Sequence, residues 1–528
     1  MPNSSSDPNA DMPLAESLKS DFPSSIIVFL VALPLCIGIA QASETPEATG
    51  LITGIVGGLV VGLIAGSPLQ VSGPAAGLFV LVAQSVEQHG LAALGLIVLI
   101  AGAIQLAAGL MKLGNWFRAV SPSVIQGMLS GIGVLILASQ FHVMVDDHDA
   151  AKPWLEAGYN KGIANLITIP QSFWLGVSPM DDSPHHLAAM VGVGSILILI
   201  GWKYIPIAPL RIIPGPVVAV VAAAVTTLVS GWDITHVDVP ENLLDGISLP
   251  STAAWTGLNY QGIILAGFTI ALVASAETML CATAVDQMQS RIRTNYNKEL
   301  TAQGVGNLVC GVLGALPMTG VIVRSSANVD AGAKTRMSAW LHGLWLLLFV
   351  AALPWVLNYI PTASLAAVLV FTGWKLINIK AITKLFQVGN PEGMICVITL
   401  ALVVGIDLLT GVLVGIACTA ARLLYTFARF DIKIEDHPES GRTDLRLRGA
   451  ATFLALPRLA EVLDEVPGKT ELHVHLERLT YIDHACLEQF VNWEKRHAAS
   501  GGQLVMDWEG LTAKFEDAGH SLIEDTRY

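Results

Sequence analysis

The sequence predicts a polytopic all-α membrane protein that is followed by a small C-terminal α/β domain. Of its 528 residues, 53% are apolar and 13% are charged, and the mean hydropathy is +0.60. A soluble protein of this length needs far more charge to cover its surface. Nearly uncharged segments recur between residues 24 and 427. Each can supply the roughly 20 apolar residues that cross a bilayer.

The N-terminal residues and the cysteines indicate the cellular compartment. Residues 1–20 are rich in Ser, Pro and Asp and lack a basic region, which predicts a disordered cytoplasmic tail rather than a cleavable signal peptide. The six cysteines form no spaced pair in a loop, which is typical of core residues in a reducing compartment. The formal net charge of −13 argues against a nucleic-acid partner.

The basic residues of the connections predict the orientation. Lys and Arg gather in alternate connections, and positive residues stay on the cytoplasmic side. The groups are Lys112 and Arg118; Lys203 and Arg211; Arg291, Arg293 and Lys298; Lys334 and Arg336; and Lys375, Lys380 and Lys384. We therefore expect a multi-pass protein of a bacterial inner membrane, with both termini in the cytoplasm and about fourteen spans.

Two apolar segments are interrupted by short irregular stretches, at residues 72–77 (SGPAAG) and 317–326 (PMTGVIVRSS). Irregular backbone is tolerated at membrane depth only where it is buried in protein or lines a cavity. Two such breaks at equivalent places predict a 7+7 inverted repeat in which helices 3 and 10 are broken. The alternative is that each break is only a kink in a packed helix.

The half-helices after the two breaks predict an anion site, because their free N–H groups and partial positive charge attract negative ions. Arg324 is the only full positive charge nearby. It either holds the anion or pairs with an acid such as Glu277, and the sequence leaves both readings open. The predicted substrate contacts are Ser72, Gly73, Ala75, Ala76, Val321, Ile322 and Arg324.

A carboxylate, Glu277, lies within the long apolar segment FTIALVASAETMLCATAVDQM. An ionisable residue in a span is costly and therefore indicates a function, the alternative being a hydrogen-bonded structural role. Oxygen ligands suit Na⁺, whereas a carboxylate alone can carry a proton. The predicted ion-coupling group is Glu277, Cys281, Thr319 and Gly320, with Glu277 as a hypothetical Na⁺ ligand and no other cofactor.

After Arg422 the pattern changes to alternating strands and helices. Residues 21–430 are predicted to form the transport domain, 431–443 a polar linker, and 444–528 a cytoplasmic α/β domain. Within this domain, strands are predicted at 445–449, 471–476 and 503–507, and helices at 456–466, 484–497 and 511–518.

Residues 297–336 (NKELTAQGVGNLVCGVLGALPMTGVIVRSSANVDAGAKTR) resemble the signature of the SulP (sulfate permease) family. Residues 31–40 (VALPLCIGIA) and the 72–77 motif resemble it too, and the C-terminal segment resembles the STAS domain of that family. The resemblance implies a fourteen-span inverted repeat whose core bundle moves against a gate, and a homodimer that involves the STAS domain. It also implies a substrate such as sulfate, bicarbonate, chloride or a dicarboxylate.

The motifs are similar to those of the bacterial bicarbonate branch, in which an acid with a hydroxyl one turn later helps to bind Na⁺. Glu277 and Cys281 take these two places, although a thiol is a poor ligand for a hard ion. Ser72 takes the place of a hydroxyl residue at the anion site. In many STAS relatives a phosphorylated serine follows the aspartate at a loop-to-helix junction, but His484 follows Asp483, so this switch is not expected.

The sequence thus predicts a secondary active transporter of a small inorganic anion, with bicarbonate first and Na⁺ or H⁺ as the coupling ion. Sulfate and dicarboxylate are the alternative substrates. Two other classes stay open, namely an anion channel or voltage-driven motor and a membrane sensor that signals through the STAS domain. The chain contains no H-E-x-x-H motif, phosphate-binding glycine loop or Cys–His zinc spacing, so we do not expect an enzyme.

Overall fold

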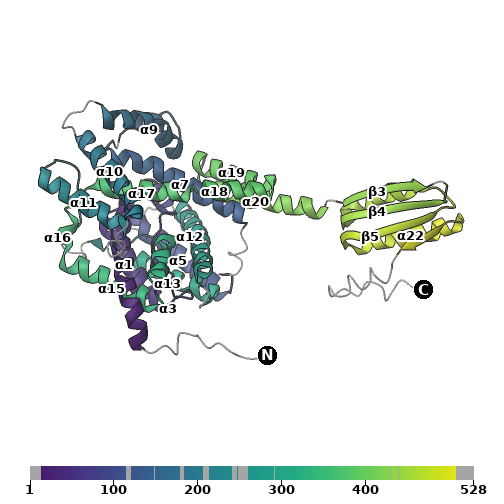
Figure 1. The fold of residues 1–528 in the computed structure, drawn as a ribbon, viewed down its shortest axis with the longest axis horizontal. Helices are drawn as coiled ribbons and strands as arrows, with labels where there is room; N and C mark the ends of the chain where they lie inside the picture. Colours follow the sequence, from purple (N-terminus) through teal and green to yellow (C-terminus); the bar gives the residue numbers. More distant parts are fainter. Residues whose placement is uncertain are drawn as a thin grey trace. The chain divides into compact units, whose positions relative to one another are not determined.

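The computed structural model describes residues 14–114, 121–147, 149–178, 184–205, 213–240, 246–247, 260–289, 292–428, 430–437 and 439–506. The chain separates into two units, residues 1–416 and 417–528, and each is described by itself. The first is built from helices and one short two-stranded ribbon, and the second contains a four-stranded sheet (Figure 1).

Eight helical segments among the described residues are long and apolar enough to cross a membrane. They are α1 (Leu14–Ala42), α2 (Glu47–Val56) with η1 and α3 (Gly62–Ile64), α5 (Leu91–Leu110), α7 (Pro122–Met144), α10 (Pro184–Gly201), α12 (Tyr260–Met288), α17 (Thr362–Leu376) with α18 (Ile379–Val388), and α20 (Leu408–Ala428). Shorter apolar helices are α11 (Gly215–Ser230), α15 (Met337–Ala352) and α19 (Asn390–Gly405). The predicted polytopic helical fold is confirmed, whereas the number of fourteen spans stays a prediction.

Four further helices bear on the site, namely α4 (Phe79–His89), α9 (Lys161–Val177), α13 (Tyr296–Leu313) and α14 (Ile322–Asp330). The two halves of the chain pack reciprocally, since α1 packs on α15 as α12 packs on α5. Likewise, η1 (Gly57–Val61) packs on α15 as α13 packs on α5. This exchange of equivalent helices is what an inverted repeat requires.

We call α1–α5 with α12–α15 the core bundle, and α7, α9, α10, α11, α17 and α19 the gate bundle. In the gate bundle, α7 packs against α17, α19 and α9, and α10 packs against α17, α11 and α9. Helix α1 joins the two groups through contacts with α7, α11 and α17. The first unit therefore consists of two helix groups, and the two broken segments belong to the core bundle.

Helix α1 begins at Leu14, so residues 14–20 are helical and their prediction as disordered tail is wrong. Residues 1–13 lie outside the described part of the chain. Residues 14–20 are ordered as a helix because a tertiary contact holds the start of α1. The buried Asp21 carboxylate accepts hydrogen bonds from the backbone N–H groups of Lys334 (2.7 Å) and Thr335 (3.2 Å) and from the Thr335 hydroxyl. These bonds attach the start of α1 to the loop after α14.

The second unit contains a four-stranded sheet in the order β3-β4-β5-β6. Its strands are β3 (Phe430–His437), β4 (Arg442–Ala451), β5 (Glu471–Ile482) and β6 (Gln503–Met506), and its helices include α21 (Leu456–Asp464) and α22 (His484–Ala499). β3 is antiparallel to β4, and the other pairs are parallel. Leu459, Phe490 and Trp493 belong to its own apolar core. The α/β prediction is confirmed, and the predicted helix 511–518 lies outside the described residues.

Residues 431–443 do not form the predicted linker, because most of them belong to β3 and to its turn into β4. Ile432 and Ile434 alternate with charged residues and pack against the domain core, which is the pattern of an edge strand. At the other junction, the Asp483 side chain accepts a hydrogen bond from the Cys486 N–H (2.9 Å) and caps α22. The predicted loop-to-helix junction at Asp483 and His484 is therefore confirmed.

Candidate anion and ion-coupling site

The two interrupted segments meet as a short antiparallel ribbon. β1 (Ser72–Pro74) pairs with β2 (Met318–Gly320), with Ser72 opposite Gly320 and Pro74 opposite Met318. β2 leads into α14, and β1 leads through a turn into α4. Two half-helices from distant parts of the chain therefore follow one ribbon, as the paired breaks predict.

The starts of these half-helices differ from the prediction in two respects. Helix α4 begins only at Phe79, because residues 76–78 form a turn in which the Leu78 N–H donates to the Ala75 carbonyl (3.2 Å). Ala75 and Ala76 therefore precede the helix, since the chain must turn from the strand into the helix axis. Helix α14 begins at Ile322 as expected, but the Val321 N–H donates to the Val71 carbonyl (2.9 Å) and is not free for an anion.

One face of α13 holds both strands of the ribbon. The Gln303 amide donates to the Ser72 hydroxyl oxygen (2.6 Å) and to Glu299 Oε1 (2.9 Å). Asn307 donates to the Met318 carbonyl (3.1 Å) and accepts from the Met318 N–H (2.7 Å). Ser72 is buried, and its hydroxyl proton has no acceptor among the bonds that the structure shows, so it can be donated to an anion.

The roles of Glu299, Gln303 and Asn307 were not predicted, although the sequence contains the signal. These three polar residues recur every fourth position, which places them on one face of an α-helix. The Glu299 carboxylate is fully buried and also accepts from the Ser67 N–H (2.8 Å) and the Gln70 amide (2.9 Å). This buried network fixes the chain that leads into β1.

Arg324 lies in the first turn of α14 and is fully buried. Its Nη2 lies 3.3 Å from Cys36 Sγ, whereas Nε and Nη1 have no hydrogen-bond partner. A Cβ atom built on Gly73 would lie 2.2 Å from Nη1, so the guanidinium lies directly against β1. Over the described residues no carboxylate pairs with Arg324, and the alternative of a pair with Glu277 is wrong. A buried guanidinium with free donors is a strong anion ligand.

The Glu277 carboxylate lies against the turn after β1. A Cβ atom built on Gly77 would lie 2.7 Å from Oε2 and 2.9 Å from Oε1. The Gly77 backbone amide and the Thr319 hydroxyl face the carboxylate, and Oε2 has no hydrogen-bond partner. Glu277 therefore contacts the segment of the first break and the strand of the second, which suits a residue that couples the two.

Cys281 does not join this group. Its buried thiol lies 3.4 Å from the Ser325 hydroxyl and packs with Leu69 and Val285. The Gly320 N–H donates to the hydroxyl of Thr278, the residue after Glu277 (3.3 Å). The hydroxyl that faces the carboxylate is therefore that of Thr319. Among the described residues no three His, Cys, Asp or Glu side chains form a metal cluster, so a cation here would use one carboxylate with neutral oxygens.

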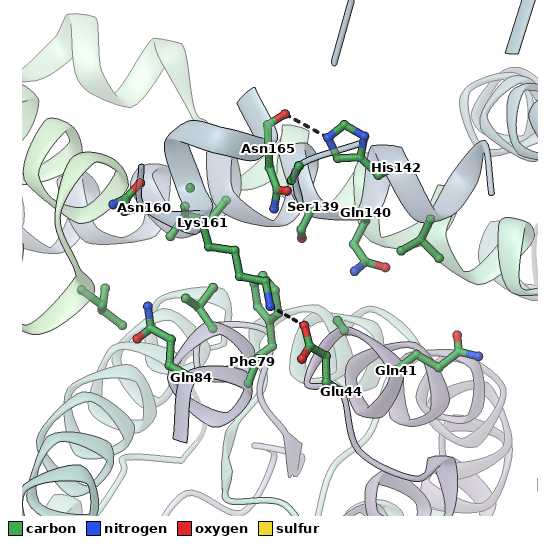
Figure 2. A pocket seen from close by; sticks show the side chains of 18 of the residues that line it. Gln41, Glu44, Phe79, Gln84, Ser139, Gln140, His142, Asn160, Lys161 and Asn165 are labelled. Atoms are coloured by element: carbon green, nitrogen blue, oxygen red, sulfur yellow. Dashed lines mark hydrogen bonds and ion pairs between the residues drawn. The ribbon is translucent and has the colours of Figure 1, made fainter. Parts of the chain in front are cut away.

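A cavity of about 430 Å³ lies between the core bundle and the gate bundle (Figure 2). Phe79, the first residue of α4, lines it from the core side. The cavity is thus continuous with the start of the half-helix that follows the first break. The ribbon residues themselves are not among those that line it.

A core bundle whose two half-helices begin at one ribbon, packed against a second bundle, defines an inverted-repeat membrane transporter. The chain belongs to the sulfate permease family, whose sequence profile matches residues 18–399. It is therefore an anion transporter rather than an enzyme, and its substrates are small inorganic anions. The assignment of the α/β unit as a STAS domain stays a prediction.

Two curated relatives cover most of the chain. YvdB of Bacillus subtilis (strain 168), whose name proposes sulfate as its substrate, is 27% identical over 511 residues, which is 91% of this chain and 90% of YvdB. The bicarbonate transporter BicA of Synechocystis sp. (strain ATCC 27184 / PCC 6803 / Kazusa) is 26% identical over 413 residues, 76% of this chain and 68% of BicA.

Two solved structures share the fold. The transmembrane domain of a cyanobacterial BicA has a TM-score of 0.62 at 21% identity and covers 77% of this chain and 98% of its own. The murine Slc26a9 anion transporter in the inward-facing state has a TM-score of 0.75 at 14% identity and covers 98% of this chain and 89% of its own. The latter match extends over both units of the chain.

Proposed function

We propose that this protein is a secondary active transporter that moves bicarbonate across the bacterial inner membrane together with Na⁺, with both termini in the cytoplasm. The proposal rests on two charged side chains at the ribbon that have no oppositely charged partner among the described residues. Arg324 has two guanidinium nitrogens without a partner, and Glu277 has a carboxylate oxygen without one. A monovalent oxyanion at Arg324 and a monovalent cation at Glu277 would neutralise both groups.

Charge compensation also explains coupling. The oxyanion accepts from Arg324, from the Ser72 hydroxyl and from the free N–H groups at the start of α14. Na⁺ is held by the Glu277 carboxylate and the Thr319 hydroxyl. With both ligands bound, Arg324 and Glu277 each face an opposite charge as the core bundle moves past the gate bundle. A carrier with one ligand keeps a buried net charge, which raises the barrier to this movement.

Sulfate is the second candidate, because YvdB is named for it. A dianion would leave one extra negative charge beside Glu277, unless a second cation or a proton accompanies it. A proton on Glu277 in place of Na⁺ is the alternative coupling ion. A homodimer that involves the α/β domain stays a prediction.

The test uses the purified full chain in proteoliposomes. Uptake of labelled bicarbonate and labelled sulfate is measured with an inward Na⁺ gradient, with an inward proton gradient and with neither, at alkaline pH where label is retained. We expect bicarbonate to accumulate only with the Na⁺ gradient. Current without accumulation indicates a channel, and accumulation of neither anion would refute the proposal.

Ser72→Ala should raise the KM for the anion about tenfold, which is the effect of losing one hydrogen bond to a charged ligand. The maximal rate should change little, because the ribbon keeps its backbone pairing. Ser85→Ala on α4 is the matched control, since the Ser85 hydroxyl donates only to the Leu81 carbonyl of its own helix. An unchanged KM in the Ser72 variant would remove this hydroxyl from the site.

A shortened chain that ends at Ala428, before β3, should bind the anion within about twofold of the full chain. All contacts proposed for the anion lie between residues 72 and 324, and the α/β domain has a core of its own. Anion binding to the purified protein is measured by isothermal titration calorimetry. A folded shortened chain without anion binding would show that the domain contributes to the site.

A further inference from the structure

The cavity between the bundles has a polar lining that the ribbon site does not use (Figure 2). The core bundle contributes the turn between α1 and α2 and the outer face of α4. The gate bundle contributes α7, the start of α9 and the junction of α19 with α20. A ligand that reaches Phe79 at the start of α4 along this cavity therefore passes between side chains of both bundles.

One ion pair crosses the cavity, from Nζ of Lys161 on the gate bundle to Oε1 of Glu44 on the core bundle (Figure 2). The other ion pairs between described residues lie at the start of α8 (Lys152–Glu156), between α7 and α9 in the sequence, or within the α/β domain. Among the residues that the structure describes, this pair is therefore the only ionic link between core and gate.

The backbone holds both members of the pair in place. The Asn160 side chain accepts from the Ile163 N–H (2.8 Å) and donates to the carbonyls of Val404 (3.2 Å) and Ile406 (3.0 Å). These bonds attach the start of α9, and with it Lys161, to the end of α19. Glu44 follows the end of α1 with a φ of 55°, and there its N–H donates to the Gln41 carbonyl (3.0 Å) while the Thr45 N–H donates to the Ala40 carbonyl (3.1 Å), the pattern of a Schellman helix end.

Two amide side chains of the gate bundle line the same cavity as Lys161. Gln140 is 4% exposed and Asn165 is 9% exposed, and both line the cavity. Neither amide group is hydrogen bonded to a described residue, and Figure 2 shows both on the gate side, facing the gap to the core. Since both side chains line the cavity, their amide groups are available to a ligand that enters it.

We infer that Lys161, Gln140 and Asn165 form an access site for a small inorganic oxyanion, which the anion occupies before it reaches the ribbon. The carboxylates of Glu47, Asp147 and Asp407 also line the cavity, where they accept hydrogen bonds from the side chains of Gln41, Ser172 and Thr410. Lys161 is the one Lys or Arg among the described lining residues, so an anion binds only beside its ammonium group, and the two amides donate to its oxygens. This inference rests on the proposed function, since it adds an earlier binding step to anion transport.

The Glu44 carboxylate occupies the access site as a competitor. An exposed ion pair contributes only roughly 0–1 kcal/mol, so an incoming anion can replace Glu44 on Lys161. This exchange breaks the ionic link between core and gate. Anion binding at the access site therefore frees the core bundle to move, and the bundles stay linked when no anion is present.

Two substitutions that each replace a charged residue by glutamine test the inference, because they are expected to shift the KM in opposite directions. Lys161→Gln should raise the KM for uptake of labelled bicarbonate or sulfate about tenfold, because a charged ligand contact is lost. Glu44→Gln should lower this KM about threefold, because the competing carboxylate is gone. If the pair only links the bundles, both variants lose the same contact and shift KM in one direction, which would overturn the inference.

Lys152→Gln is the matched control, because Lys152 on α8 (Lys152–Glu156) pairs with Asp149 and does not line the cavity. Neither substitution should unfold the chain, since the Lys161 and Glu44 side chains are 34% and 52% exposed. Normal uptake with an unchanged KM in Lys161→Gln would refute the access site alone. Absence of uptake by the unmodified chain would refute the proposed function and the access site together.

Chemical rescue tests the role of the Lys161 charge independently. Lys161→Cys treated with 2-aminoethyl methanethiosulfonate regains an amine in the cavity, and its KM should return to within about twofold of the unmodified chain. The sulfonatoethyl reagent adds a negative charge and should raise the KM further. Five of the six native cysteines are buried, and the unmodified chain treated in the same way controls for Cys418. Equal effects of the two reagents would overturn the inference.

Discussion

Glu277→Gln is expected to lower cation-driven anion uptake at least about a hundredfold, which corresponds to about 2.8 kcal/mol, while the chain stays folded in the membrane. Glutamine keeps the shape of the side chain and removes its charge. The carboxylate has no cationic partner among the described residues, and its Oε2 makes no hydrogen bond. Its charge is therefore needed for a bound cation and not for the packing of α12.

Uptake into proteoliposomes with and without a Na⁺ gradient measures this loss, and circular dichroism with gel filtration reports folding. Glu87→Gln at the exposed end of α4 is the matched control. Gly77→Ala should reproduce much of the loss, because its Cβ would lie 2.7 Å from Glu277 Oε2 and displace the carboxylate. Coupled uptake at the normal level in Glu277→Gln would refute its role as the coupling residue.

Arg324→Gln is expected to weaken anion binding at least about a hundredfold and to leave the unfolding temperature unchanged or higher. Removal of a buried charge that lacks a carboxylate partner relieves a desolvation cost and breaks no ion pair. A structural arginine behaves differently, because its loss leaves a partner unpaired. The combination of lost binding with retained stability therefore identifies Arg324 as a ligand of the anion.

Calorimetric titration with bicarbonate and with sulfate measures the binding, and differential scanning fluorimetry measures the unfolding temperature. Arg293→Gln, an exposed position in the connection before α13, is the control for loss of a positive charge. Arg324→Lys should restore little, because an ammonium group lacks the planar fork of donors. A parallel fall in unfolding temperature and anion affinity would indicate a structural role instead.

The sequence by itself determined the membrane class and the position of the two breaks. Both follow from local rules, since a bilayer accepts only apolar helices and tolerates Gly- and Pro-rich irregular backbone only where it is enclosed. Glu277 and Arg324 were found for a related reason, because a charge stands out in an apolar segment. The polar stripe of α13 and the alternation in β3 were also present in the sequence, but they were read as a family signature and as a linker.

Only the tertiary structure decided which groups meet. Arg324 contacts Cys36 and Gly73 instead of Glu277, and the Val321 N–H is used by the Val71 carbonyl. Lys161 and Glu44, which are 117 residues apart, meet across the cavity. A sequence pattern reports the face of a helix on which a residue lies, but it does not report which distant face packs against it. The free donors, the unpaired charges and the access site therefore depend on the packing of the whole bundle.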